Sequence, residues 1–186
     1  MALKSTICKA VIDIADIDHG YYAQHSLTIA CHPSETEERM MVRVIAFVLN
    51  VHQVQTLCQG DAELAFGAGL SDPDDPDLGI VDYTGRRRVW IEVGQPDERA
   101  LTRASSRADR VCVYPFSAAV DIWWSQLAPK LSRQNKLEVW QLASESTRQL
   151  GLLASRSMTL QATIQDGMLM IGSGAELVTI EPRRLL

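Results

Sequence analysis

Residues 77–107, DLGIVDYTGRRRVWIEVGQPDERALTRASSR, decide how the rest of this 186-residue chain is organised. Two runs of mixed apolar character flank Thr84-Gly85, a pattern that predicts two strands joined by a tight turn. Asp97, a residue type favoured at the N-cap, then precedes a run with apolar residues at helical spacing. The stretch therefore predicts a β-hairpin followed at once by a helix.

Two carboxylates lie at the ends of the neighbouring strands of this hairpin, Asp77 and Glu92. Glu92 has apolar neighbours in what the pattern indicates is a central strand, where an unpaired carboxylate is costly. Mg²⁺ binds a few carboxylate oxygens and keeps several waters, and Mn²⁺ accepts the same ligands. The pair therefore predicts a site for Mg²⁺ or Mn²⁺, which would polarise a phosphoryl oxygen and lower the pKa of a bound water.

The predicted helix repeats arginine every four residues, at Arg99, Arg103 and Arg107. Residues at this spacing lie along one side of a helix. Two interpretations stay open. The arginines either form a solvated face, or they bind the phosphodiester backbone of a nucleic acid beside the carboxylates.

The clearest helix is predicted over residues 32–52, HPSETEERMMVRVIAFVLNVH. Ser34 is the predicted N-cap, and Glu37 three residues later completes a capping box. Glu38 borders the apolar stripe of this helix. It either stabilises the first turn as acids commonly do there, or it points into a cleft beside the sheet and assists the metal site.

The remaining elements alternate between strands and helices. The pattern predicts strands or hairpin arms at residues 5–14, 21–31, 110–116, 136–143, 158–171 and 176–182, and helices at 117–132 and 144–157. Residues 55–75 mix Gly, Pro and Asp, which predicts a partly ordered connection. These elements predict a mixed α/β (α+β) fold that opens with an N-terminal hairpin and has a C-terminal β-hairpin turning at Asp166-Gly167.

The composition, with 46% hydrophobic and 22% charged residues, is that of an ordinary globular protein, and the length predicts one domain over residues 1–186. The net charge of −5 means that a nucleic-acid partner would need a local basic patch. We expect no membrane partner, since no apolar run approaches the roughly 18 residues of a span. Four separated cysteines without a CxxC pair predict reduced thiols and a cytoplasmic location: Cys8, Cys31, Cys58 and Cys112.

Several catalytic motifs are missing from the sequence. It has no GxSxG elbow before a helix, no Walker loop and no dinucleotide fingerprint. The histidines show no HExxH or other ligand spacing, and we interpret each as a surface or loop residue: His19, His25, His32 and His52. The carboxylate pair therefore remains the leading candidate for chemistry.

The sequence resembles the YaeQ family of bacterial proteins over nearly the whole chain. The resemblance is carried by MALKSTICKA at the start, HPSETEERMM, DLGI from Asp77, WIEVGQPDER, DIWW, and MTLQATIQDG near the end. It implies the fold of the PD-(D/E)XK nuclease superfamily, which is a central mixed sheet flanked by helices with a carboxylate-bearing hairpin at its heart. On this resemblance Asp77 matches the motif Asp, and Glu92 matches the acidic position two residues before the usual Lys.

The sequence departs from that motif at the Lys position, which is Gly94. A glycine supplies no cation but leaves room for another side chain. The candidates are Lys9 from the first strand, Gln95 just after the strand, and Arg103 from the next helix. If none reaches the site, it binds metal without efficient cleavage.

Three hypotheses follow. The leading one is a nuclease-like, Mg²⁺-dependent enzyme acting on nucleic acid, with Asp77 and Glu92 on the metal and Glu38 assisting. The second is a non-catalytic nucleic-acid-binding module on the same fold, which Gly94 and the acidic net charge favour. The third is a protein-interaction or regulatory role, favoured by the Trp123-Trp124 pair and the negative surface.

Overall fold

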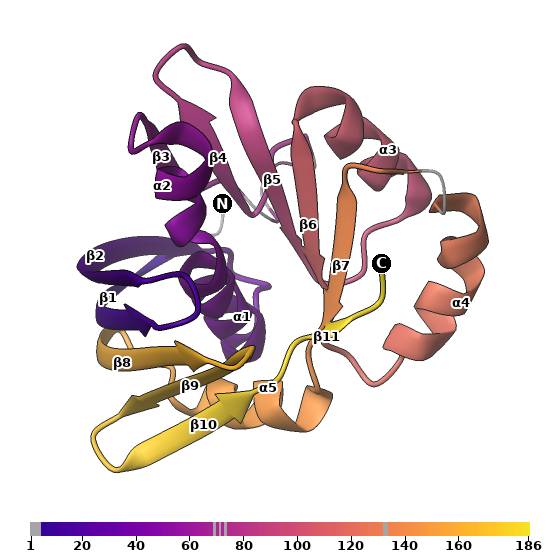
Figure 1. Ribbon diagram of the computed structural model, residues 1–186. Helices are drawn as coiled ribbons and strands as arrows, with labels where there is room; N and C mark the ends of the chain where they lie inside the picture. The colour runs from indigo at the N-terminus through magenta and orange to yellow at the C-terminus, as the bar shows by residue number, and fades with distance from the viewer. Residues whose placement is uncertain (1–4, 69, 71, 73, 132–133) are drawn as a thin grey trace.

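A mixed α/β fold with two mixed sheets and five helices is formed by the residues that the computed structural model describes, which are 5–68, 70, 72, 74–131 and 134–186. Figure 1 shows the two sheets as two halves of the molecule, with one long helix where they meet. The predicted fold class is confirmed. The single central sheet that the resemblance implied is instead two sheets, because the N-terminal and C-terminal hairpins pair with each other.

The five-stranded sheet has the order β10-β9-β8-β1-β2. Its strands are β1 (Thr6–Asp16), β2 (Tyr21–Cys31), β8 (Ser157–Gln165), β9 (Met168–Ser173) and β10 (Glu176–Ile180). β1 pairs antiparallel with β2 and parallel with β8, which joins the two predicted hairpins. At the β8–β9 turn Asp166 and Gly167 both have positive φ, 53° and 75°, as the predicted Asp-Gly turn requires.

The six-stranded sheet has the order β11-β7-β6-β5-β4-β3. Its strands are β3 (Ala62–Phe66), β4 (Leu78–Asp82), β5 (Arg87–Val93), β6 (Arg110–Tyr114), β7 (Leu137–Gln141) and β11 (Arg183–Arg184). β4 and β5 form the predicted hairpin, and β5, β6 and β7 run parallel to one another. Glu92 therefore lies on an interior strand of this sheet, as the sequence predicts.

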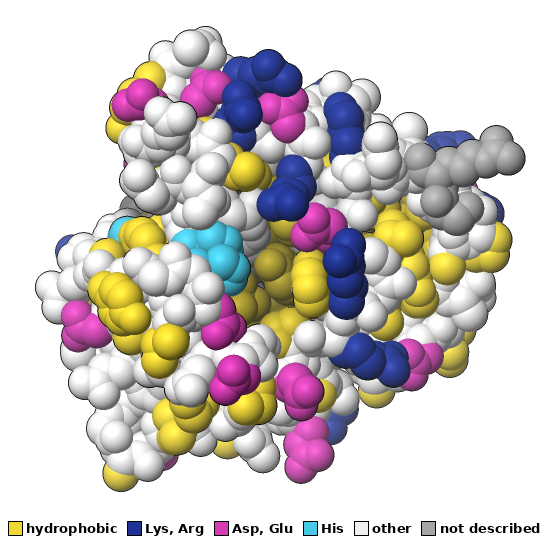
Figure 2. All heavy atoms as spheres, in the orientation of Figure 1, with side chains coloured by type: hydrophobic (Ala, Val, Ile, Leu, Met, Phe, Trp, Pro, Cys, Tyr) yellow, Lys and Arg dark blue, Asp and Glu magenta, His cyan; other side chains and the backbone are white. Residues whose placement is uncertain are grey.

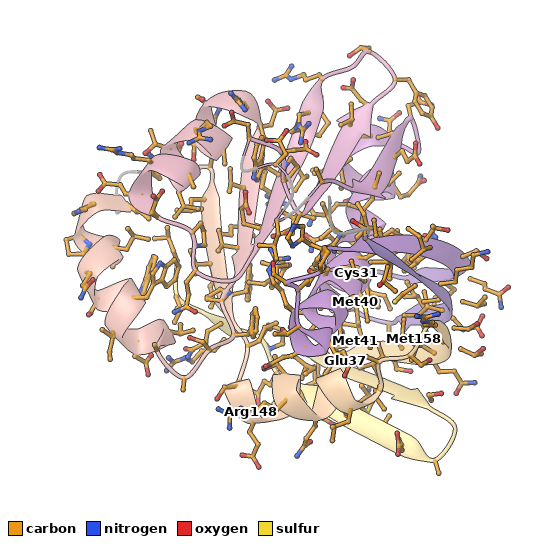
Figure 3. All side chains as sticks on the ribbon, turned by 180° about the vertical axis from the view of Figure 1, so that it is seen from behind. Cys31, Glu37, Met40, Met41, Arg148 and Met158 are labelled. Atoms are coloured by element: carbon orange, nitrogen blue, oxygen red, sulfur yellow. The ribbon has the colours of Figure 1, made fainter. Side chains whose placement is uncertain are left out.

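The helices are α1 (Glu37–Asn50), α2 (His52–Cys58), α3 (Glu98–Arg107), α4 (Val120–Leu131) and α5 (Ser144–Leu152). Ten of the 14 residues of α1 are buried, because a helix that is apolar on nearly every side must be covered on every side. Its apolar core includes residues of both sheets. Seen from behind, Met40 and Met41 of α1 lie near Cys31 of β2 and Met158 of β8 (Figure 3).

A second apolar core lies on the other face of the six-stranded sheet, under α3 and α4 (Figure 1). Within the described residues no single helix has the length and apolar character to cross a membrane. Only α1 and α2 taken together meet that criterion, and a bend of 41° separates them.

Two local predictions are wrong. Thr36 rather than Ser34 is the N-cap of α1, and its hydroxyl accepts a hydrogen bond from the backbone N–H of Arg39 at 3.1 Å. Ser34 hydrogen bonds to His32 instead, so the predicted capping box does not form. Residues 55–75, predicted as a partly ordered connection, include the end of α2 and the whole of β3. The apolar alternation of β3 is short and lies between Gly- and Asp-rich segments, so the sequence pattern did not indicate a strand.

Candidate functional site

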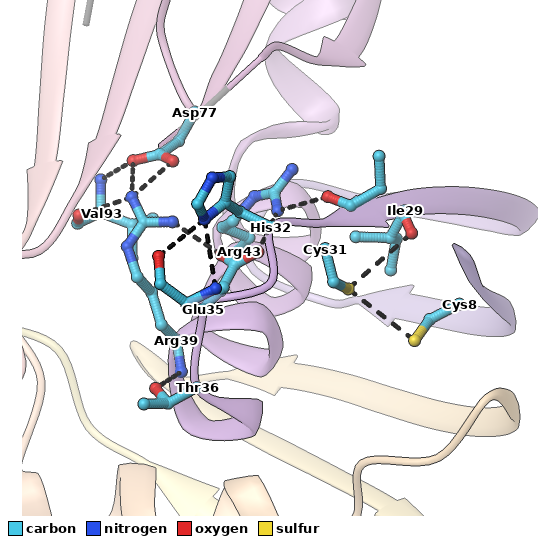
Figure 4. Close-up of polar contacts among 12 residues, drawn as sticks. Cys8, Ile29, Cys31, His32, Glu35, Thr36, Arg39, Arg43, Asp77 and Val93 are labelled. Carbon is cyan, nitrogen blue, oxygen red and sulfur yellow. Dashed lines mark hydrogen bonds and ion pairs between the residues drawn. The ribbon is translucent and has the colours of Figure 1, made fainter. Parts of the chain in front are cut away.

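Asp77 lies directly before β4 and is 1% exposed. Its Oδ2 accepts a hydrogen bond from the backbone N–H of Val93 at 2.8 Å. One guanidinium nitrogen of Arg39 donates to both carboxylate oxygens, at 2.6 Å and 2.8 Å (Figure 4). Charge-assisted bonds of this kind fix the orientation of a buried carboxylate.

Arg39 is the cation of this site, and the sequence analysis missed it. It lies on α1 and also donates to Glu35 Oε1 at 2.7 Å, while Arg43 donates to Glu35 Oε2 at 2.9 Å (Figure 4). Glu35, Arg39 and Arg43 are spaced four residues apart, so the negative Glu35 precedes the positive Arg39 by about one helical turn. That spacing, together with the presence of an arginine within an apolar helix, is the sequence signal from which these ion pairs could have been predicted.

Glu92 lies on β5 beside Asp77, and it is half-buried. Its Oε1 accepts a hydrogen bond from Trp90 Nε1 at 2.6 Å. The pKa of Glu92 is raised to about 7, chiefly by burial; the nearby charge of Asp77 adds to the rise, and the Trp90 hydrogen bond and the charge of Arg39 oppose it. The charge of Asp77 therefore lies near enough to act on Glu92.

Asp77 and Glu92 keep unused acceptor positions that could serve a Mg²⁺ ion that keeps several waters. Each carboxylate oxygen has two lone pairs, and Asp77 Oδ2 uses both, on Arg39 and Val93. Asp77 Oδ1 accepts from Arg39 alone, and Glu92 Oε2 has no hydrogen-bond partner among the described residues. No third His, Cys, Asp or Glu of the described chain completes a three-ligand cluster with them, so water would fill the other positions.

The other predicted catalytic residues are placed differently. Glu38 faces α5, where its Oε1 accepts a hydrogen bond from the Thr147 hydroxyl at 2.6 Å. Lys9 is exposed on the outer face of β1, since its neighbours Cys8 and Ala10 point into the core. Gln95 is half-buried just after β5. The structure therefore does not bring Glu38 or Lys9 to Asp77.

At Gly94 the backbone has a φ of 105°, and a Cβ built there meets nothing within 4 Å. The open space that the sequence predicts is present. Arg39, which approaches from α1, is the guanidinium that contacts Asp77 and the backbone carbonyl of Val93 next to it.

The three arginines of α3 have different surroundings. Arg103 forms an ion pair with Asp74, and Arg107 donates to the backbone carbonyl of Asp74 at 2.9 Å. Both therefore tie the segment that leads into Asp77 to α3. Arg99 is exposed and lines a surface depression with Trp123 and Lys130.

The tryptophan pair that favoured a protein-interaction role packs in part against the protein's own second apolar core. Trp123 and Trp124 lie against the second apolar core, and Trp123 Nε1 donates to the carbonyl of Pro96 at 3.0 Å. Both side chains are half-buried. Packing of α4 onto the loop after β5 accounts for this feature.

A second polar cluster joins residues that the sequence analysis had treated as isolated. Asp16 at the end of β1, His19 in the following turn and His52 at the start of α2 place their ligand atoms within 4.8 Å of one another, so they could hold a metal ion. Burial, together with the nearby His19, lowers the pKa of His52 to about 4. The prediction that each histidine is a surface or loop residue missed this contact, because 33 residues separate the two histidines.

This cluster borders a cavity of about 310 Å³ between the two sheets. Figure 2 shows the histidine side chains at one rim of a hollow with an apolar floor, and basic side chains on the opposite rim. His19 and His52 line the cavity on one side, and Arg110, Tyr114 and Glu138 line it on the other.

Comparisons with known proteins identify relatives that match most of the chain. A family model described as "YaeQ protein" matches residues 1–182. The YaeQ protein of Salmonella typhi is 42% identical over 168 residues, which cover 90% of this chain and 88% of the relative. The YaeQ protein of Escherichia coli (strain K12) is 41% identical over 170 residues, 91% of this chain and 89% of the relative.

Two crystal structures have the same fold. The YaeQ protein from Xanthomonas axonopodis pv. citri has a TM-score of 0.88 at 40% identity and covers 98% of both chains. The YaeQ protein from Pseudomonas syringae has a TM-score of 0.89 at 30% identity, covering 98% of this chain and 96% of the other.

Proposed function

This chain belongs to the YaeQ family, and on that premise we propose that it is a metal-dependent, nuclease-like protein that acts on phosphodiester bonds of nucleic acid. Its site would be a modified form of the PD-(D/E)XK motif at Asp77 and Glu92. One observation carries the proposal: Arg39 pairs with Asp77 at 2.6 Å, close enough to Glu92 for its charge to act on that carboxyl, and so supplies the cation that Gly94 lacks.

The residues have separate roles in this proposal. Asp77 Oδ1 and Glu92 Oε2 would hold the Mg²⁺ or Mn²⁺ ion, which when bound polarises the phosphodiester and acidifies a water. Arg39 fixes the orientation of Asp77 and offers a guanidinium to charge that develops on the phosphate. Glu92, with a pKa of about 7, releases its proton when a cation binds beside it.

The test is cleavage of single- and double-stranded DNA and RNA with Mg²⁺ or Mn²⁺. Asp77→Asn and Glu92→Gln should each abolish metal-dependent cleavage, because each removes a metal ligand while keeping the size of the side chain. Glu63→Gln, an exposed acid on the edge strand β3, is the matched control and should cleave as the wild type does. Cleavage that survives both active-site substitutions would refute the assignment.

A non-catalytic binding module is the second candidate, favoured by the occupation of both Asp77 oxygens by Arg39. It predicts salt-sensitive binding of nucleic acid without turnover. The exposed Arg99 gives the cleaner probe than Arg103, because Arg103 also holds Asp74. In this alternative Arg99→Glu weakens the binding of nucleic acid. Neither added metal nor Asp77→Asn changes the length of the bound strand, because the strand is not cleaved.

A further inference from the structure

Asp16, His19 and His52 bring one carboxylate and two imidazoles to one point. His19 Nδ1 lies 2.8 Å and His52 Nδ1 lies 3.6 Å from Asp16 Oδ2. Ligand atoms on a tetrahedral ion with bonds of about 2.0–2.1 Å stand about 3.3 Å apart. The two observed separations lie on either side of that value, and all three ligand atoms lie within 4.8 Å of one another, so rotation of the side chains can bring them onto one ion.

Contacts among the described residues do not explain the position of one buried polar atom of His52. Its Nδ1 is buried and has no hydrogen-bond partner among the described residues. It points to the carboxylate of Asp16, whose side chain is 1% exposed. A buried nitrogen without a partner destabilises the folded state, and a bound ion would remove that cost.

Contacts with neighbouring segments stabilise the backbone that carries the three side chains. The turn that carries His19 is fixed by Asp18, whose carboxylate accepts the backbone N–H groups of Asp166 and Gly167 at 2.8 Å each. The His19 and His52 rings stack, with centroids 3.7 Å apart and planes 9° apart. The backbone of the ligands is therefore supported before any ion arrives, and Asp18 is already occupied elsewhere. At least one ring must turn out of the stack to bind, because the Nδ1 lone pair lies in the plane of its ring and two parallel planes do not meet at one ion.

The cluster opens on one side to the cavity between the sheets, which has a volume of about 310 Å³. Across this cavity Arg110 bonds to Glu138 and to Gln53, and Tyr114 bonds to Asn50. Sites with three protein ligands and one open position leave that position for water or a small ligand, whereas structural zinc sites are closed by four protein ligands. The geometry here corresponds to the open kind.

We propose that Asp16, His19 and His52 form a second metal site, which binds a first-row divalent transition ion such as Zn²⁺ and leaves one coordination position open to the cavity. Two imidazoles with one carboxylate favour such ions over Mg²⁺, which prefers oxygen ligands alone. The ion replaces the proton that His19 Nδ1 shares with Asp16. This site does not depend on Asp77 and Glu92.

The experiment is a titration of the metal-free full chain with Zn²⁺ by calorimetry, followed by Co²⁺ and its visible absorption. The wild type should bind one Zn²⁺ per chain, and Mg²⁺ should not compete. Loss of a residue that only orients a metal ligand costs about 10–100-fold in affinity, so His52→Ala and His19→Ala should each cost about 100-fold or more. His19 has a 44% exposed side chain, so its substitution tests the site even if His52→Ala misfolds.

Two controls separate this site from other binding. His32→Ala removes a histidine outside the cluster and should leave the affinity for Zn²⁺ unchanged, as should the double variant Asp77→Asn/Glu92→Gln. Cys8 and Cys31, with sulfurs 3.8 Å apart, are the rival ligands, and sulfur-to-metal charge transfer in the Co²⁺ spectrum would reveal them. That band, the absence of stoichiometric Zn²⁺ binding, or wild-type affinity in His19→Ala would overturn the proposal.

Discussion

Replacing Glu92 by Gln should change how the stability of the protein depends on pH. The pKa of Glu92 is about 7 in the folded chain against 4.5 for the free side chain, chiefly because of burial. The folded state therefore binds the proton more tightly than the unfolded state. The contribution of Glu92 to stability is therefore greatest below pH 4.5, falls as the pH rises towards 7, and stays at the lower value above that.

The size of this fall follows from the difference of about 2.5 pKa units, at 1.36 kcal/mol for each unit, which gives about 3 kcal/mol. Gln keeps an oxygen that accepts from Trp90 Nε1 and carries no charge. The free energy of unfolding of Glu92→Gln, relative to the wild type, should therefore be about 3 kcal/mol higher at pH 8 than at pH 4.5.

Urea unfolding of both proteins at half-unit steps from pH 4.5 to 8.5 measures this difference. Glu63→Gln, which removes an exposed acid, should follow the wild-type curve. Saturating Mg²⁺ should shrink the difference, because an ion beside Glu92 stabilises the ionised carboxylate. Wild-type and Glu92→Gln curves that stay parallel across the whole range would refute the reasoning.

Two further substitutions test the contacts of α1. Arg39→Ala should lower the free energy of unfolding by about 3–5 kcal/mol, measured by urea unfolding, because it leaves Asp77 buried without its cation. A loss below about 1 kcal/mol would show that water replaces the guanidinium. Thr36→Ala should cost about 1 kcal/mol in the same assay, whereas Ser34→Ala should cost almost nothing, and the reverse order would restore Ser34 as the N-cap.

Most of the hairpin and its carboxylate pair could be predicted because their signals are local. Apolar alternation, the Thr84-Gly85 turn and the Asp97 cap all lie within about thirty residues of one another, and they fix where Asp77 and Glu92 stand along their strands. The Asp166-Gly167 turn is of the same kind. The joining of the two terminal hairpins into one sheet could not be predicted, because β1 and β8 are about 140 residues apart and no local rule pairs them.

The cation of the site was missed because it depends on how a helix is rotated. Successive residues of a helix point about 100° apart, so the first turn of α1 cannot present Glu38 and Arg39 to the same neighbour. The docking of α1 turns Arg39 to Asp77 and Glu38 to Thr147 of α5. That docking is set by the apolar core shared by both sheets, which no segment of the sequence defines alone.

Dependence on tertiary packing also explains why the cluster of Asp16 with the two histidines was not predicted. Asp16 and His19 are three residues apart, but His52 joins them only because the junction of α1 and α2 packs against the β1–β2 turn. Spacing rules for metal ligands detect short repeats within one element. A site assembled from a turn and a helix start lies outside their range.

Binding of a hard divalent ion by Asp77 and Glu92 is tested most directly by Mn²⁺ titration with electron paramagnetic resonance, performed on His19→Ala so that the second cluster does not contribute. We predict one bound Mn²⁺ per chain, displaced by excess Mg²⁺ and lost in both Asp77→Asn and Glu92→Gln. Undiminished Mn²⁺ binding after either substitution, or no binding in their parent, would contradict a metal centre at this hairpin.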